Sequence, residues 1–216
     1  MRHHTLSRFL SVFVGVMSLL LLSGCGTYYT VSVDSLRDDA QPDKGSYFLE
    51  PGDEAVRPDD LLFREAAQQI GQALVMQGKR VVDKRSEAQN IARISYWEGT
   101  PETRVDYGTR TTSVPVTTRH HGKYHTEYVY VEEPTVTTYT VYSAGMLIEA
   151  YTLAKDKETP LWRTSVRCSG PEDDFRGLLA IMTPVLSSQL GEQTMGTRRF
   201  EVFVEDNGKI SVSAMD

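Results

Sequence analysis

Features that mark several common classes of enzyme and binding protein are missing from this chain of 216 residues. It has only two cysteines, Cys25 and Cys168, and no Cys-x-x-Cys pair, so no disulfide framework is indicated. It also lacks a Gly-x-Ser-x-Gly elbow and a phosphate-binding glycine loop. Basic residues are in the minority, 23 against 29 acidic ones, which argues against a nucleic-acid partner. With no candidate catalytic residue, we predict that the protein is not an enzyme.

The first 24 residues show the three-part pattern of a secretory signal peptide. Arg2 and Arg8 make a positive start, and residues 9–22 form an apolar run that is short for a membrane span of about 20 residues. The run ends in Leu-Ser-Gly-Cys, with Gly24 before the predicted cleavage point and Cys25 after it. These four residues resemble the bacterial lipobox, in which small residues precede a cysteine that receives a diacylglycerol. We therefore predict that Cys25 is the lipid-bearing first residue of the mature protein.

Lipidation at Cys25 would set the location of the remaining 192 residues, a length that suits one domain. A diacylglycerol and an N-acyl chain on Cys25 should hold the protein at the membrane permanently, whereas a single acyl chain binds only reversibly. The residue after Cys25 is Gly26, and not the aspartate that retains many Gram-negative lipoproteins at the inner membrane. We therefore expect the mature protein to lie at the periplasmic face of the outer membrane. These 192 residues hold 21 basic and 29 acidic side chains, a formal net charge of −8. Membrane contact is therefore expected through the lipid alone, and no other cofactor is predicted.

Periodicity in residues 25–216 predicts a single domain with two amphipathic helices. The first covers residues 60–77, with Asp59 and Asp60 as the N-cap and first-turn acids and Gly78 as the stop, and the second has the acids of residues 172–174 in its first turn. Pro184 lies inside the second helix, where a kink or a break is expected. Alternating residues predict strands at 28–33, 47–49, 79–82, 90–97, 145–154, 161–169 and 200–204, with a loosely held tail after residue 208. The expected fold class is α+β: a mostly antiparallel sheet with two helices on one face and a long protruding β-hairpin.

One strand of this set has a clear inward face. In residues 161–169, alternation places Trp162, Val166 and Cys168 on one side and both arginines, Arg163 and Arg167, on the other. We therefore expect Cys168 to be a buried core thiol with no partner in the chain.

Residues 104–142 are rich in threonine, valine and tyrosine, and they are expected to form the hairpin as an arm inserted in the domain. Gly122 and Lys123 have the Gly-first form of a type II′ turn. The alternative is a half-ordered, low-complexity loop. With that turn, facing residue numbers sum to 245, so His120 faces His125 and Val114 faces Val131. The arm base near these two valines is expected to pack on the domain, and the tip is expected to stay free.

The tip of the predicted arm carries the candidate interaction residues. Exposed strand edges accept another strand, so self-association or β-augmentation is the expected binding mode. The candidate residues are His120, His121, Tyr124, His125 and Tyr128.

Three of these residues are histidines, which raises the alternative of a metal site. Zinc ligands lie about 2.0–2.1 Å from the metal, so only side chains on one face of the hairpin can share an ion. The predicted register brings His120 and His125 together and sends His121 to the opposite side. Two ligands make a weak site, so no metal is predicted, and His120 and His125 are the only candidate ligands.

Two stretches resemble a recurrent pattern in a large group of uncharacterised bacterial envelope lipoproteins. Residues 74–96 have the helix, the glycine, the strand ending in Val-Asp and the alanine-led strand of that pattern. Residues 146–190 are similar to its final hairpin and helix, where Trp162 and Arg163 match a Trp-Arg pair. Gln89 stands where that group usually has aspartate, and Thr164 where it has glycine. The resemblance implies a small α/β sandwich and no established activity or cofactor.

Two classes of function follow from these observations. The first is a lipid-anchored, non-catalytic envelope protein, a structural or interaction component whose partner is an unknown envelope protein. The alternative is a periplasmic metal-binding protein or enzyme that uses the turn of His120, His121 and His125.

Overall fold

The computed structural model describes residues 26–41, 43, 45–154 and 157–215. The predicted signal peptide, the cleavage site and Cys25 lie outside the described residues. In chain order the elements are β1 (Gly26–Arg37), β2 (Ser46–Pro51), α2 (Leu61–Met76), β3 (Arg80–Val81), the short 3-10 helix η1 (Arg85–Glu87), β4 (Asn90–Glu98), β5 (Glu102–His120), β6 (Lys123–Ala154), β7 (Lys157–Gly170), α3 (Phe175–Gln189), β8 (Arg198–Glu205) and β9 (Ile210–Met215).

The strands form one sheet in the order β3-β2-β4-β6-β7-β1-β8-β9, and β5 pairs with β6 outside this path. Strand β2 runs parallel to both β3 and β4, and the other pairs are antiparallel. The sheet is therefore mixed, and the expectation of a mostly antiparallel sheet is wrong. The reason is the connection through α2, which returns the chain to the starting edge and makes β3 parallel to β2.

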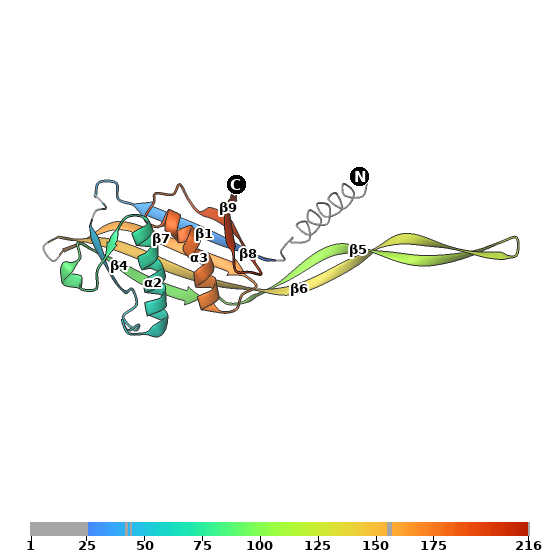
Figure 1. The fold of residues 1–216 in the computed structure, drawn as a ribbon, viewed down its shortest axis with the longest axis horizontal. Helices are drawn as coiled ribbons and strands as arrows, with labels where there is room; N and C mark the ends of the chain where they lie inside the picture. Colours follow the sequence, from blue (N-terminus) through green and yellow to red (C-terminus); the bar gives the residue numbers. More distant parts are fainter. Residues whose placement is uncertain (1–25, 42, 44, 155–156, 216) are drawn as a thin grey trace, which may run out of the picture.

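Both predicted helices are present and lie over the same face of the sheet (Figure 1). Asp60 caps α2 by accepting hydrogen bonds from the backbone N–H groups of Leu62 and Phe63, at 2.9 and 3.1 Å. Asp174 caps α3 in the same way, so the acids expected in the first turn of this helix lie just before it. Of the kink or break expected at Pro184, the break does not occur, because α3 continues through this residue. No helix in the described part of the chain is long and apolar enough to cross a membrane.

The hydrophobic core lies between this helical layer and the sheet. The predicted face of β7 is confirmed: Trp162, Val166 and Cys168 are buried, and Arg163 and Arg167 are exposed. Burial raises the pKa of the Cys168 thiol to about 12, so this group stays protonated at neutral pH and serves as a small core side chain. Other large core side chains are Tyr47, Ile70, Leu74, Ile94, Met146, Ile148, Leu179, Met182 and Leu186.

The tail after residue 208 is ordered, contrary to the sequence-based expectation. It forms β9, which pairs with β8 and places Val212 opposite the buried Val202. The turn residues Asn207 and Gly208 therefore connect a hairpin at the sheet edge, because Glu205 accepts a hydrogen bond from the Gly208 N–H at 2.8 Å.

Candidate functional site

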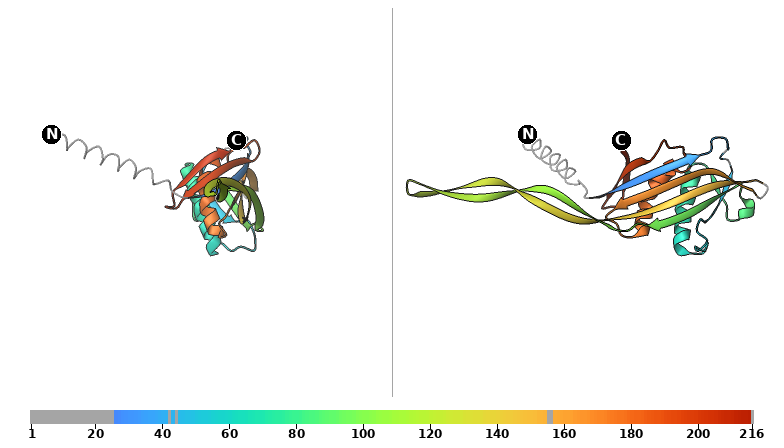
Figure 2. Two further views of the ribbon diagram at one scale, coloured as in Figure 1. Left: turned by 90° about the vertical axis from the view of Figure 1, so that its right-hand side faces the viewer. Right: turned by 180° about the vertical axis from the view of Figure 1, so that it is seen from behind.

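An arm consisting of β5 and the first part of β6 leaves one end of the sheet as a twisted two-stranded ribbon (Figures 1 and 2). The pairing runs from Glu102 opposite Val141 to His120 opposite Lys123. At about 3.3 Å per residue, the 19 residues of β5 span roughly 60 Å. No residue of the arm belongs to the hydrophobic core. Residues 102–141, called the arm below, are therefore exposed to a partner along their length.

The turn at the tip lies one residue earlier than predicted. His121 and Gly122 occupy the two turn positions, with φ of 46° and 80°. Two successive positive φ values are typical of a type I′ turn, whose second position favours glycine. Histidine is among the side chains that tolerate this region best. Facing residue numbers therefore sum to 243, and the expected sum of 245 is wrong.

This register changes the arrangement of the three histidines. His120 faces Lys123, and His125 faces Thr118, so the two histidines share a face without facing each other. His121 stacks on His120, with ring centroids 4.7 Å apart, and does not lie on the far side. His125 approaches Glu127, with its Nε2 atom 3.3 Å from a carboxylate oxygen. In the described part of the chain, no three His, Cys, Asp or Glu side chains are grouped to hold a metal ion.

The two candidate tyrosines lie on the opposite face of the arm from His120 and His125. Tyr124 faces Arg119, whose guanidinium carbon lies 5.5 Å from the tyrosine ring centre. Tyr128 faces Pro115 in an uninterrupted register. The five predicted interaction residues therefore form two surfaces, divided between the faces of the ribbon.

The arm leaves the domain well before the predicted base. Val114 and Val131 are 38% and 42% exposed, so they do not pack on the domain as expected. Val129, and not Val131, faces Val114. Sequence reasoning missed these valines as surface residues, because it treated opposed valines as a sign of core contact. Each of the two valines has a polar neighbour, Ser113 or Glu132, and this signal could have placed both valines outside the core.

The start of β1 lies at the same end of the sheet as the arm. Tyr142, where β6 enters the sheet, faces Gly170 of β7, and the neighbouring Ser169 faces Thr30 of β1. Gly26 is four residues before Thr30 and therefore lies beyond this end of the sheet, and Figure 2 shows the start of β1 near the base of the arm.

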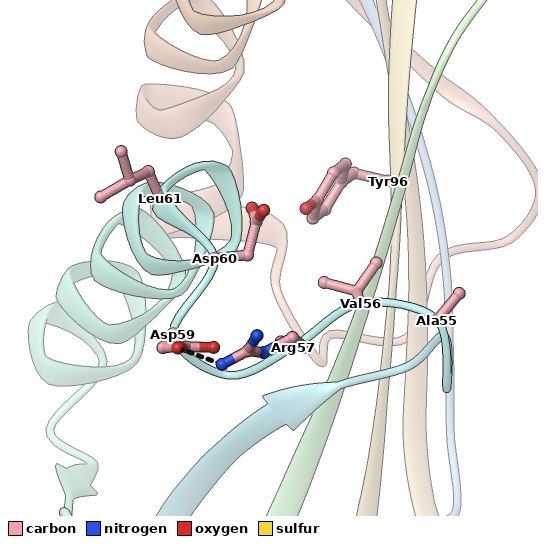
Figure 3. Close-up of a pocket in the computed structure, with 7 residues that line it drawn as sticks. All are labelled: Ala55, Val56, Arg57, Asp59, Asp60, Leu61 and Tyr96. Atoms are coloured by element: carbon pink, nitrogen blue, oxygen red, sulfur yellow. Dashed lines mark hydrogen bonds and ion pairs between the residues drawn. The ribbon is translucent and has the colours of Figure 1, made fainter.

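A second candidate is an open cleft beside the N-terminus of α2 (Figure 3). It consists of two hollows of about 410 and 480 Å³ that share Val56 and Tyr96. Burial, followed by the nearby Asp60 carboxylate, raises the pKa of Tyr96. Asp60 is already used to cap α2, and Asp59 pairs with Arg57 at 2.7 Å. The residues lining the cleft include no histidine or cysteine, so the arm is the stronger candidate.

Comparison with known proteins shows no family for this chain. No protein-family model and no curated protein matches it. Among solved structures it is similar to a PDZ domain protein from Parabacteroides distasonis, at 11% sequence identity and a TM-score of 0.45. The match covers 86% of this chain and 41% of that one, so this chain spans less than half of that protein. Membership of the envelope lipoprotein group stays a prediction.

Proposed function

We propose that the protein is a lipid-anchored, non-catalytic envelope protein, an interaction component at the periplasmic face of the outer membrane. The observation that carries this proposal is the arm, which extends roughly 60 Å from the sheet without touching the core. A two-stranded hairpin is marginal in water by itself. Exposed tyrosines along a ribbon of this length therefore favour a binding partner over a purely structural role within the domain.

The position of β1 supports a membrane-proximal arm. β1 begins at Gly26, directly after the predicted lipid-bearing Cys25, so almost no tether separates the domain from the membrane. Because Gly26 and the arm base lie at one end of the sheet, an anchor at Cys25 would hold the arm base close to the lipid surface. The partner is then expected in the layer next to the membrane.

Replacing Cys25 by serine tests the anchor. The Cys25→Ser variant should lose all labelling with a fatty-acid analogue and accumulate as uncleaved precursor, because serine offers no thiol for lipid transfer. The control Cys168→Ser should keep full labelling, since Cys168 is buried in the core. Undiminished labelling of Cys25→Ser, or recovery of the native protein with the inner membrane in density fractionation, would contradict the proposal.

Site-specific photo-cross-linking tests the arm. A photoreactive amino acid in place of the exposed Tyr128 should give cross-linked species in intact envelopes. The same substitution at Met76, an exposed residue at the end of α2, is the matched control and should give none. Equal cross-linking from both positions would show that the arm is not the preferred contact.

A further inference from the structure

The sheet carries an aromatic pair at the end where β1 begins. Tyr28 of β1 faces Phe203 of β8, with ring centroids 4.6 Å apart. Their strand neighbours Tyr29 and Val202 belong to the core, so alternation places the pair on the face opposite the helices, called the open face below. Tyr28 is 60% exposed and Phe203 is half-buried. The pair is therefore a surface feature and not a part of the core.

The pair lies directly against Gly26, the first residue of β1. Gly26 faces Glu205 and lies diagonally to Phe203 on the open face. A Cβ atom at Gly26 would overlap the Phe203 ring, so a side chain there would displace the ring. The aromatic pair therefore contacts the residue that follows the predicted lipid-bearing Cys25.

Trp97 is a third aromatic residue on the open face. It faces Gly145 of β6, and its ring fills the space that a Cβ atom of Gly145 would take. Its exposed fraction is 37%. Strands β4 and β1 are separated by β6 and β7, which is roughly 14 Å across the sheet. Two aromatic sites therefore lie on one face, on either side of the strand that continues into the arm.

Charge distinguishes the open face from the helix side at this end of the sheet. Between the levels of Gly26 and Ser32, the charged residues of the open face and of the adjoining β8–β9 turn are balanced. They are Arg167, Arg199, Lys209, Glu201, Glu205 and Asp206. The helix side instead carries the acids of residues 172–174 directly before α3. The open face is therefore the side that phosphate-bearing lipid head groups repel less.

The distance to the predicted lipid places the aromatic pair at the membrane surface. Tyr28 is three residues after Cys25, at most about 11 Å along the chain. The polar head-group layer is roughly 5 to 8 Å thick on each side of the bilayer. A lipid on Cys25 would therefore bring Tyr28 and Phe203 to this layer without any change in the fold. Aromatic rings are enriched there, and tyrosine and tryptophan above all.

The arm restricts how the anchored domain can be oriented. It leaves the same end of the sheet as Gly26 (Figure 1) and is roughly 60 Å long. Both of its faces are charged, for example at Arg110 and Glu132, so it is excluded from the hydrocarbon core. An upright domain with this end on the membrane would drive the arm into the bilayer. The arm must therefore run along the surface, with one face of the sheet end turned to the lipid.

We propose that the open face at this end binds the phospholipid head-group layer through Tyr28, Phe203 and Trp97. The inference rests on the proposed lipid anchor and adds a contact made by the protein itself. It orients the domain, with the helices away from the membrane and the arm along its surface. Because the charges of this face are balanced, the contact depends on the rings and little on anionic lipid.

Tryptophan quenching in the processed lipoprotein tests this contact. The protein is reconstituted in vesicles of phosphatidylethanolamine and a phosphatidylcholine brominated on the upper part of its acyl chains. In a Trp97→Phe background, the remaining Trp162 is buried and gives a constant signal. Adding Tyr28→Trp should give emission of which about half or more is lost to the brominated lipid. Met76→Trp, the matched control, lies exposed on the helix layer and should lose about a tenth or less.

Energy transfer from the arm to the membrane tests the orientation. A dye is attached through Thr118→Cys near the tip, since Cys168 is buried, and the acceptor is a lipid dye. Tyr28→Asp puts a charge into the contact and should lower the transfer by about twofold or more. Leu36→Asp, the matched control at the far end of the same face of β1, should leave it unchanged. Both replaced side chains are more than half exposed, so both variants should fold, as circular dichroism will show.

The outcomes separate this inference from the proposed function. A native chain without fatty-acid label on Cys25 overturns the anchor and this inference with it. A labelled chain whose tryptophan at position 28 stays unquenched overturns the membrane contact alone and leaves the proposed function standing. Equal quenching at positions 28 and 76 overturns the assignment to the open face. An equal effect of Leu36→Asp overturns the assignment to the end of the sheet that holds Gly26.

Discussion

Replacing Trp162 by alanine is expected to lower the free energy of unfolding by about 3 to 5 kcal/mol. The ring is 4% exposed and lies on the helix-covered face of β7. It packs against Tyr47, with ring centroids 6.1 Å apart, and against the backbone at Gly191. The Gly191 φ of +68° and its close approach to the ring leave no room for a larger residue there. Truncation would therefore leave a cavity that its neighbours cannot fill by small shifts.

The indole also anchors a buried polar chain. Trp162 Nε1 donates to the Tyr47 hydroxyl at 3.0 Å, and that hydroxyl donates to Asp43. Lys79 Nζ lies 2.6 Å from the same carboxylate. Burial, with the bond to Asp43, raises the pKa of Tyr47, so the phenol remains protonated. Loss of the indole N–H adds to the loss of packing, because it leaves the buried phenol oxygen without its donor.

The matched control for Trp162→Ala is Arg167→Ala, on the exposed face of the same strand. Its effect on the free energy of unfolding should be roughly 0.5 kcal/mol or less. The free energy of unfolding of each variant is measured by denaturant-induced unfolding and compared with that of the wild type. The comparison requires that the dependence of this free energy on denaturant concentration is the same for all three proteins. Comparable losses from the two would mean that the faces of β7 are exchanged.

Local periodicity was sufficient for the helices and for the faces of single strands. Asp59 and Asp60 marked the start of α2 and Gly78 marked its end, because capping depends on neighbouring residues alone. The alternation around Trp162 placed β7 in the correct phase for the same reason. Strand direction was not predictable in this way, since alternation says which face a residue occupies and not which strand is next to it. The parallel pairing of β2 with β4 therefore appeared only in the structure.

In the arm, too, the local sequence did not determine which residues face each other. Composition and a glycine in the turn predicted a hairpin, but the register depended on which two residues form the turn. Gly122 is the second of these residues and not the first, because His121 also adopts a positive φ. Facing pairs changed along the whole arm as a result, and Val114 came to face Val129.

Removal of the arm should abolish cross-links to envelope partners and leave the melting temperature of the domain almost unchanged. The variant deletes residues 105–138 and joins Arg104 to Tyr139 through Asn-Gly. Arg104 faces Tyr139, so the native register is kept, and Asn-Gly suits the type I′ turn that closes the native hairpin. A deletion designed on the predicted sum of 245 would instead shift the pairing by two residues.

Thermal unfolding and envelope cross-linking of this variant separate a binding role from a folding role. None of the deleted residues contributes to the core, so the cooperative transition should persist within a few degrees of the wild type. If deletion of residues 105–138 unfolds the domain, the arm is part of the folding unit and its assignment as an interaction element is wrong.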